Sequence, residues 1–231
     1  MMLLPGFGEV FVSARVRLVL SLAITIVITP AVTSSIPALP DGPIGMLMTL
    51  GREMVIGLFL GGLTRIMIAA LHTAGTIMGF QSSLANAQQF DPINSTQGSL
   101  LGTFLNVLGV FLIFMSDLHH MMLMAVADSY QVFRPGVPLP IGDFAETAIR
   151  ALGDSFLLAM QISSPLIVMG MLFYIGLGLL ARLMPQVQVF FIAIPIQIIL
   201  AFMVMAVSLS AGMMWFLGSF QGKFQGILFA G

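Results

Sequence analysis

The chain has 231 residues, of which 58% are hydrophobic, and its net charge is −1. Only 7% of the residues are charged, against about 25% in soluble domains, and the mean hydropathy is +1.08, so we expect an integral membrane protein. The chain has no cysteine, which excludes disulfides and thiolate chemistry, and its charge balance gives no indication of nucleic-acid binding.

The N-terminal region does not have the pattern of a cleavable secretory signal. Its first apolar run is short and is interrupted by Pro5, so we expect membrane insertion to depend on later segments. The first of these is the uncharged run 18–40, in which Pro30 is expected to end the helix. A membrane span needs about 20 residues, so this helix is long enough only if it begins near Val10.

A second apolar segment predicts a long helix over 44–84. At 1.5 Å per residue it would be roughly 60 Å long, about twice the hydrocarbon core of a bilayer. The helix therefore either breaks near Gly61-Gly62 or projects beyond the bilayer. Four of its residues recur at every fourth position and form one stripe, which we interpret as a packing face: Glu53, Gly57, Gly61 and Arg65. The alternative for its charges is that they extend to the membrane interface near the helix start.

Two further glycine pairs, Gly75 with Gly79 and Gly98 with Gly102, have the four-residue spacing that lets helix backbones approach closely. We expect them, like Gly57 and Gly61, to pack helices together.

Between these pairs lies the most polar stretch of the chain, whose only charge is Asp91. Asp91-Pro92 ends any helix that enters it. Polar non-helical backbone between membrane helices is tolerated when it is buried in protein or lines a water-filled cavity. A surface loop is the simpler alternative. The residues that we expect to carry the function of this stretch are Gln81, Asn86, Gln88, Gln89, Phe90, Asp91, Pro92 and Asn94.

No catalytic constellation is evident, and no cofactor or metal site is predicted. His119 and His120 are adjacent, and on a regular helix neighbouring side chains point about 100° apart, which disfavours a shared ion. Carboxylates in membrane segments sometimes relay protons, but those of this chain are scattered, so we favour packing or capping roles: Glu53, Asp91, Asp117 and Asp128.

The last third reads as a helical hairpin. Residues 143–182 and 187–220 predict two long helices, with a short connection at Arg182–Gln186. Pro165 and Pro195 lie inside the two arms and are expected to kink them. The chain as a whole therefore predicts an all-α membrane fold of long kinked helices and helical hairpins.

Several short runs in this chain resemble the FliR family, a subunit of the flagellar type III export gate that is similar to SctT-type injectisome proteins. Their order and spacing extend over nearly the whole chain. The runs are LLPGFGE from Leu3, VSARVRLVLSLAITIVITP ending at Pro30, Gly51–Gly57 with Gly61, Ala74-Gly75 with Gly79-Phe80-Gln81, Asp91-Pro92, His119, Asp128-Ser129-Tyr130 with Pro135-Gly136, and Arg182–Gln186 with Val189-Phe190.

The resemblance implies one helical membrane domain over 1–231, FliP-like over 1–135 and with a FliQ-like hairpin over 143–223. It implies a non-enzymatic subunit in the bacterial inner membrane, at the flagellar basal body. The implied partners are FliP and FliQ subunits, a FlhB-like switch subunit, FlhA and rod proteins, and the unfolded flagellar proteins that cross the shared channel.

The family also implies two functional segments. Residues 84–99 correspond to a loop that plugs the closed channel, and the hairpin tip with Arg182, Pro185 and Gln186 resembles a cytoplasm-facing tip near the switch subunit. Family members usually have a further helix before the LLPGFGE-like run, so we expect most of that helix to be missing here.

A different class of function, a secondary transporter or channel for a small solute, is the alternative. A transporter typically has broken helices at corresponding positions of two related halves. The discontinuity at Asp91-Pro92 has no counterpart in the second half of this sequence, which favours the export gate.

Overall fold

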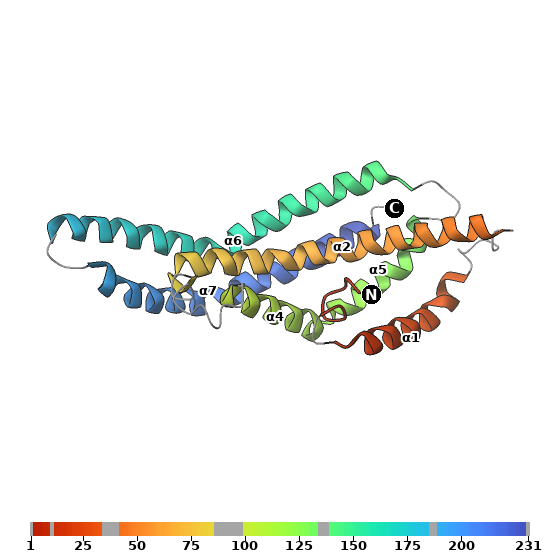
Figure 1. Cartoon of the computed structure of the whole chain (residues 1–231), viewed down its shortest axis with the longest axis horizontal. Coiled ribbons are helices and arrows are strands. Elements are labelled where there is room, and N and C mark those ends of the chain that lie inside the picture. Colours follow the sequence, from red (N-terminus) through yellow and green to blue (C-terminus); the bar gives the residue numbers. More distant parts are fainter. Residues whose placement is uncertain are drawn as a thin grey trace. The chain divides into compact units, whose positions relative to one another are not determined.

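The computed structural model describes residues 2–9, 12–33, 42–85, 99–133, 139–184 and 189–229, the side chains of 189–191 and 227–229 excepted. Within these ranges the chain is helical and forms no strand, so the predicted all-α fold is confirmed for them (Figure 1). The helices are α1 (Ala14–Val32), α2 (Pro43–Gln81), α4 (Leu100–Met115), α5 (Leu118–Val132), α6 (Ile141–Leu183) and α7 (Val189–Phe229).

Four of these helices are long and apolar enough to cross a membrane: α1, α2, α6 and α7. The helices α4 and α5 meet at a 77° bend and together make a fifth candidate span. The helix α2 is continuous over 39 residues, which corresponds to roughly 60 Å. Of the two sequence-based alternatives for this segment, the unbroken helix that is longer than a hydrocarbon core is the one observed.

Helix ends lie close to their predicted positions, with two differences. The helix α1 passes through Pro30 and ends at Val32, and α7 continues beyond the predicted 220 to Phe229. The hydroxyl groups along α1 donate to carbonyls three or four residues earlier, which satisfies them within an apolar span: Ser21, Thr25, Thr29 and Thr33.

The chain forms two compact units, each built from separate parts of the sequence. The first unit contains the described residues of Met1–Ile68, Val110–Gly153 and Ser219–Gly231, and the second contains those of Ala69–Gly109 and Asp154–Gly218. The division into 1–135 and 143–223 that we predict follows chain order instead. It remains a prediction.

The core of the first unit is apolar and includes part of the N-terminal segment. Leu4 of this segment is buried, as are Ile113 and Met122. Phe59 of α2 stacks on Phe144 of α6 with ring centroids 4.1 Å apart, and the helix α1 packs against α5. Aromatic pairs of this kind add stability beyond the area they bury.

The core of the second unit lies where α2, α4, α6 and α7 contribute apolar residues. Ala74, Leu105, Leu166 and Phe216 are fully buried there. Gly109 of α4 faces the Leu71 side chain at a position where a Cβ atom would collide with it. This contact places the second half of α2 against α4.

Candidate functional site: the ends of the polar segment

The predicted plug segment begins where α2 ends, in the second unit. Gln81 is the last residue of α2 and is half-buried, whereas 86–98 lie outside the described residues. The sequence-predicted residues Asn86, Gln88, Gln89, Phe90, Asp91, Pro92 and Asn94 fall in this range, as does Gly98. The structure therefore bears on the two ends of the segment.

The N-terminal end of the segment is held by a buried amide of α7. Gln197 is 2% exposed; its Nε2 atom donates to the Gln81 carbonyl at 2.7 Å, and its Oε1 atom accepts from the Ser83 hydroxyl at 2.8 Å. Ser82 and Ser83 are also buried. The Ser83 hydroxyl and the Gln81 carbonyl therefore both have partners in an apolar surrounding, where an unmade hydrogen bond would cost about 1–3 kcal/mol.

Backbone conformation and close packing reinforce this end. Ser83 has φ 58°, in the left-handed region that ends a helix but is unfavourable for most residues. Gly170 of α6 lies against the Gln81 side chain, and a Cβ atom at Gly170 would come within 3 Å of the Gln81 amide oxygen. The exit of the chain from α2 is thus held by both α6 and α7.

The C-terminal end of the segment is held against α2 by a serine. Ser99 accepts the N–H of Gly102 at 3.1 Å, as a helix N-cap does, and its hydroxyl donates to the Gly75 carbonyl at 3.1 Å. A Cβ atom added at Gly79 would lie 3.3 Å from the Ser99 hydroxyl. The segment therefore leaves from the end of α2 and returns beside its last turns.

The glycines Gly75 and Gly102 lie at a close approach of two helix backbones. A Cβ atom on Gly75 would come within 3 Å of the Gly102 backbone, and one on Gly102 would lie 2.9 Å from the His72 carbonyl. Backbones can come this close only where neither residue has a side chain.

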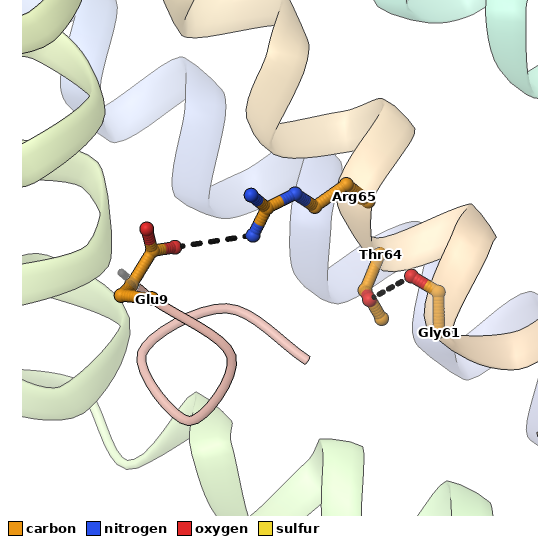
Figure 2. Close-up of polar contacts among 4 residues, drawn as sticks. All are labelled: Glu9, Gly61, Thr64 and Arg65. Carbon is orange, nitrogen blue, oxygen red and sulfur yellow. Dashed lines mark hydrogen bonds and ion pairs between the residues drawn. The ribbon is translucent and has the colours of Figure 1, made fainter. Parts of the chain in front are cut away.

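The stripe on the first half of α2 has a different environment at each residue. Glu53 lies close enough to Tyr130 of α5 for the two side chains to interact electrostatically, and a Cβ atom on Gly57 would meet nothing within 4 Å in this chain. A Cβ atom on Gly61 would lie 2.6 Å from Leu3. Arg65 forms an ion pair with Glu9 at 3.3 Å, one turn beyond Gly61 (Figure 2).

The N-terminal segment is thus seated on α2, as Figure 2 shows for Glu9 and Arg65. Glu9 is mostly buried, with 12% of its side chain exposed, and Arg65 is 47% exposed. Thr64 satisfies its own hydroxyl within α2 by donating to the Gly61 carbonyl at 2.7 Å. The stripe thus contacts the N-terminal segment and α5, and Gly57 remains open.

The predicted hairpin tip is described only at its start. Arg182 lies exposed in the last turn of α6, and Pro185 and Gln186 lie outside the described residues. Sequence reasoning missed Gln197, and it placed Ser83 and Ser99 in the polar stretch without giving them a role. Gln197 is the only polar side chain in the run 189–207. A lone amide in an apolar helix indicates a hydrogen bond to another helix, so the sequence does contain a signal for this residue.

Comparison with known proteins decides the family. A family model described as "Bacterial export proteins, family 1" matches residues 1–222. The chain belongs to this family, that of the FliR proteins. It is 34% identical to the flagellar biosynthetic protein FliR of Caulobacter vibrioides over 93% of this chain and 86% of that protein.

Two other relatives extend the similarity. The chain is 29% identical to FliR of Escherichia coli strain K12 over 87% of this chain and 77% of that protein. It is 27% identical to the Yop proteins translocation protein T of Yersinia pestis over 80% of this chain and 71% of that protein. The resemblance to the FliR family noted from short runs of residues is therefore confirmed, and its injectisome relative is similar as expected.

Proposed function

We propose that this FliR-family chain is a structural, non-enzymatic subunit of the flagellar type III export apparatus in the bacterial inner membrane. The observation that carries this function is the family match over residues 1–222, together with four helices suited to membrane spans. The Caulobacter and Escherichia relatives are flagellar biosynthetic proteins. The match favours protein export over the transport of a small solute.

We further propose that FliP- and FliQ-type subunits surround this chain, and that a FlhB-like switch subunit lies near Arg182. FlhA and rod proteins would be further neighbours, and unfolded flagellar proteins the cargo. Large apolar side chains on α1, α6 and α7 support extensive contacts, because they are exposed within this chain and need lipid or protein to cover them: Val19, Val27, Leu172, Ile175, Val207 and Met214.

The segment over 84–99 is proposed to obstruct the export channel when no cargo passes. Its two ends support this role, because both are fixed to the protein by buried or half-buried polar contacts rather than left in solvent. A plug held at both ends is displaced by cargo and returns to the same place. Uncharged side chains would suit a passage used by chains of either charge.

Copurification tests the first proposal. The chain, carrying an affinity tag and expressed from its own flagellar gene cluster, should be recovered in one stable complex with small helical membrane proteins of the export apparatus. Mass spectrometry of the complex would identify them. Recovery of the chain alone, monodisperse and binding a small solute, would contradict the proposal.

Ion flux tests the plug. Replacing 86–98 by a short Gly-Ser linker keeps the anchors Ser83 and Ser99 and should make the resting membrane leaky, with the complex still assembled. The matched control replaces 34–41 by a Gly-Ser linker of equal length and should not leak. An intact complex without added leak after the first replacement would remove the plug but leave the export function standing.

A further inference from the structure

The bend between α4 and α5 gathers three potential metal ligands in the first unit. Asp117 lies at the bend with φ 57° and ψ 12°, a left-handed conformation that is uncommon for a residue other than glycine. The helix therefore does not pass regularly through 116–118, and the axes of α4 and α5 diverge by 77°. This break brings the Asp117 side chain back toward the first turn of α5.

The ligand atoms of Asp117, His119 and His120 all lie within 4.8 Å of one another. Asp117 Oδ1 is 3.6 Å from His120 Nδ1, and the two imidazole rings have centroids 4.1 Å apart. In tetrahedral zinc sites, ligand bonds of about 2.0–2.1 Å place neighbouring ligand atoms about 3.3 Å apart. His119 and His120 are adjacent within α5, yet their side chains turn toward each other, and small side-chain movements would bring the three ligand atoms to coordination distances.

Packing holds one of these ligands in place. The ring of His119 stacks on Phe114 with centroids 4.8 Å apart, and Phe114 in turn contacts Phe7 at 5.5 Å. Gly6 permits this contact, because a Cβ atom there would collide with the Phe114 ring. The Nδ1 atom of His119 is buried and has no hydrogen-bond partner among the described residues. A buried nitrogen of this kind gains from any ligand that satisfies it.

We propose that Asp117, His119 and His120 bind a divalent transition-metal ion of the zinc type, with water completing its coordination. Two imidazoles and one carboxylate suit Zn²⁺ better than Mg²⁺ or Ca²⁺, which prefer oxygen ligands. Asp117 and His120 are largely exposed in the isolated chain, so no side chain of the chain itself blocks an ion from reaching them. The bound metal would fasten the bend between α4 and α5, a role independent of the proposed export function.

A simpler explanation is an ion pair between Asp117 and His120, with His119 as a packing residue. The 3.6 Å separation is too long for a hydrogen bond, and both side chains are more than 60% exposed. Exposed pairs of this kind contribute little to stability. The pair alone also leaves His119 out of the contact, whereas a metal ion engages all three side chains.

The test is metal binding by the full chain, purified with an affinity tag that contains no histidine. The chain has three histidines and no cysteine, so background sites are few. Calorimetry with Zn²⁺ should give one site per chain, and Co²⁺ should give visible absorption bands of a nitrogen- and oxygen-ligated ion. Asp117→Asn and His120→Gln should each weaken Zn²⁺ binding about tenfold or more, since loss of a partner behind the ligands already costs that much.

The variants are chosen to keep the fold. Asparagine also tolerates the left-handed conformation of Asp117, and His120 is an exposed side chain. His72→Gln, which changes the remaining histidine, is the matched control and should bind Zn²⁺ as the wild type does. Hydrogen exchange gives a second readout, because Zn²⁺ should slow exchange in 116–120 of the wild type and not of Asp117→Asn.

Three outcomes would overturn the site. They are absence of stoichiometric Zn²⁺ binding, affinity unchanged in Asp117→Asn and His120→Gln, or an equal loss of affinity in His72→Gln. The last outcome would indicate adventitious binding by any histidine of the chain.

Discussion

At the scale of single residues, glycines in this chain have two distinct environments. Gly75 faces the backbone of Gly102 with no room for a side chain, whereas Gly57 and Gly153 face open space within the chain. The same residue type therefore serves close packing at one position and leaves a free surface at another. Spacing alone does not separate these cases, because both occur at small-residue intervals along one helix.

Gly75→Ala should destabilise the chain itself. Its Cβ atom would come within 3 Å of backbone atoms of Gly102, so α2 and α4 must move apart, and overpacking of this kind costs about 1–3 kcal/mol. Thermal unfolding in detergent should show a lower midpoint. Gly153→Ala is the control, with no atom within 4 Å of the new Cβ, and should be neutral or slightly stabilising. Equal midpoints for Gly75→Ala and wild type would contradict the close approach.

Gly57→Leu is expected to act on assembly instead. The Cβ atom of the added side chain meets nothing within 4 Å in this chain, so the isolated protein should unfold much as the wild type does. If a partner helix packs on Gly57, the leucine should block formation of the export complex. The yield of complex on size-exclusion chromatography measures this effect. A normal yield would show that the open face of Gly57 is not a subunit contact.

At the scale of elements, hydrogen bonds from neighbouring helices fix both ends of the polar segment. Gln197 of α7 joins two groups at the end of α2, and Ser99 caps α4 while bonding to the Gly75 carbonyl of α2. Three helices thus contribute to the attachment of one connection. A connection restrained at both ends loses less entropy when it occupies a fixed place than a free loop of equal length.

Gln197→Leu should release the N-terminal end of the segment. The substitution leaves the Ser83 hydroxyl and the Gln81 carbonyl without partners, at about 1–3 kcal/mol for each buried group. We expect a lower unfolding midpoint and, in the assembled complex, an ion leak at rest. Gln161→Leu on α6, outside these hydrogen bonds, is the control and should not leak. A tight complex of Gln197→Leu would show that this anchor does not position the segment.

At the scale of the whole molecule, its helices differ in how much of them the chain itself covers. The most apolar window of α2 is 50% buried, against 6% for α1 and 17% for α6. The chain covers mainly the second half of α2 but leaves most of α1 and α6 exposed. Such a distribution is typical of a subunit whose remaining apolar surface is covered by lipid or by other subunits.

Cysteine labelling distinguishes surface covered by lipid from surface covered by another subunit. The natural chain has no cysteine, so an introduced cysteine is the only labelling site. Leu172→Cys on α6 replaces a side chain that is 66% exposed and should react with a maleimide in the isolated chain. Its labelling should fall several-fold in the export complex if a subunit covers α6. Leu166→Cys, at a fully buried position, is the control and should react slowly in both states. Unchanged labelling of Leu172→Cys on assembly would indicate that lipid faces this position.

The sequence by itself determined the class of the molecule and its helices. Hydropathy and the scarcity of charge predicted a membrane protein, and apolar runs bounded by prolines and glycines predicted most helix ends to within a few residues, because these properties act locally along the chain. Ordered short motifs also identified the family. The sequence did not predict that α1 continues through Pro30. Proline is tolerated inside a membrane helix because neighbouring helices or Ser and Thr side chains satisfy the backbone group that it frees.

Tertiary structure alone decided which residues meet. The pairing of Gln197 with Ser83 joins positions 114 residues apart, and the contact of Gly75 with Gly102 joins two different helices. The left-handed turn at Asp117 brings its carboxylate to the two histidines of the first turn of α5. Such contacts depend on how helices pack against one another, and residue spacing within one helix contains no information about the residue that a different helix places opposite it.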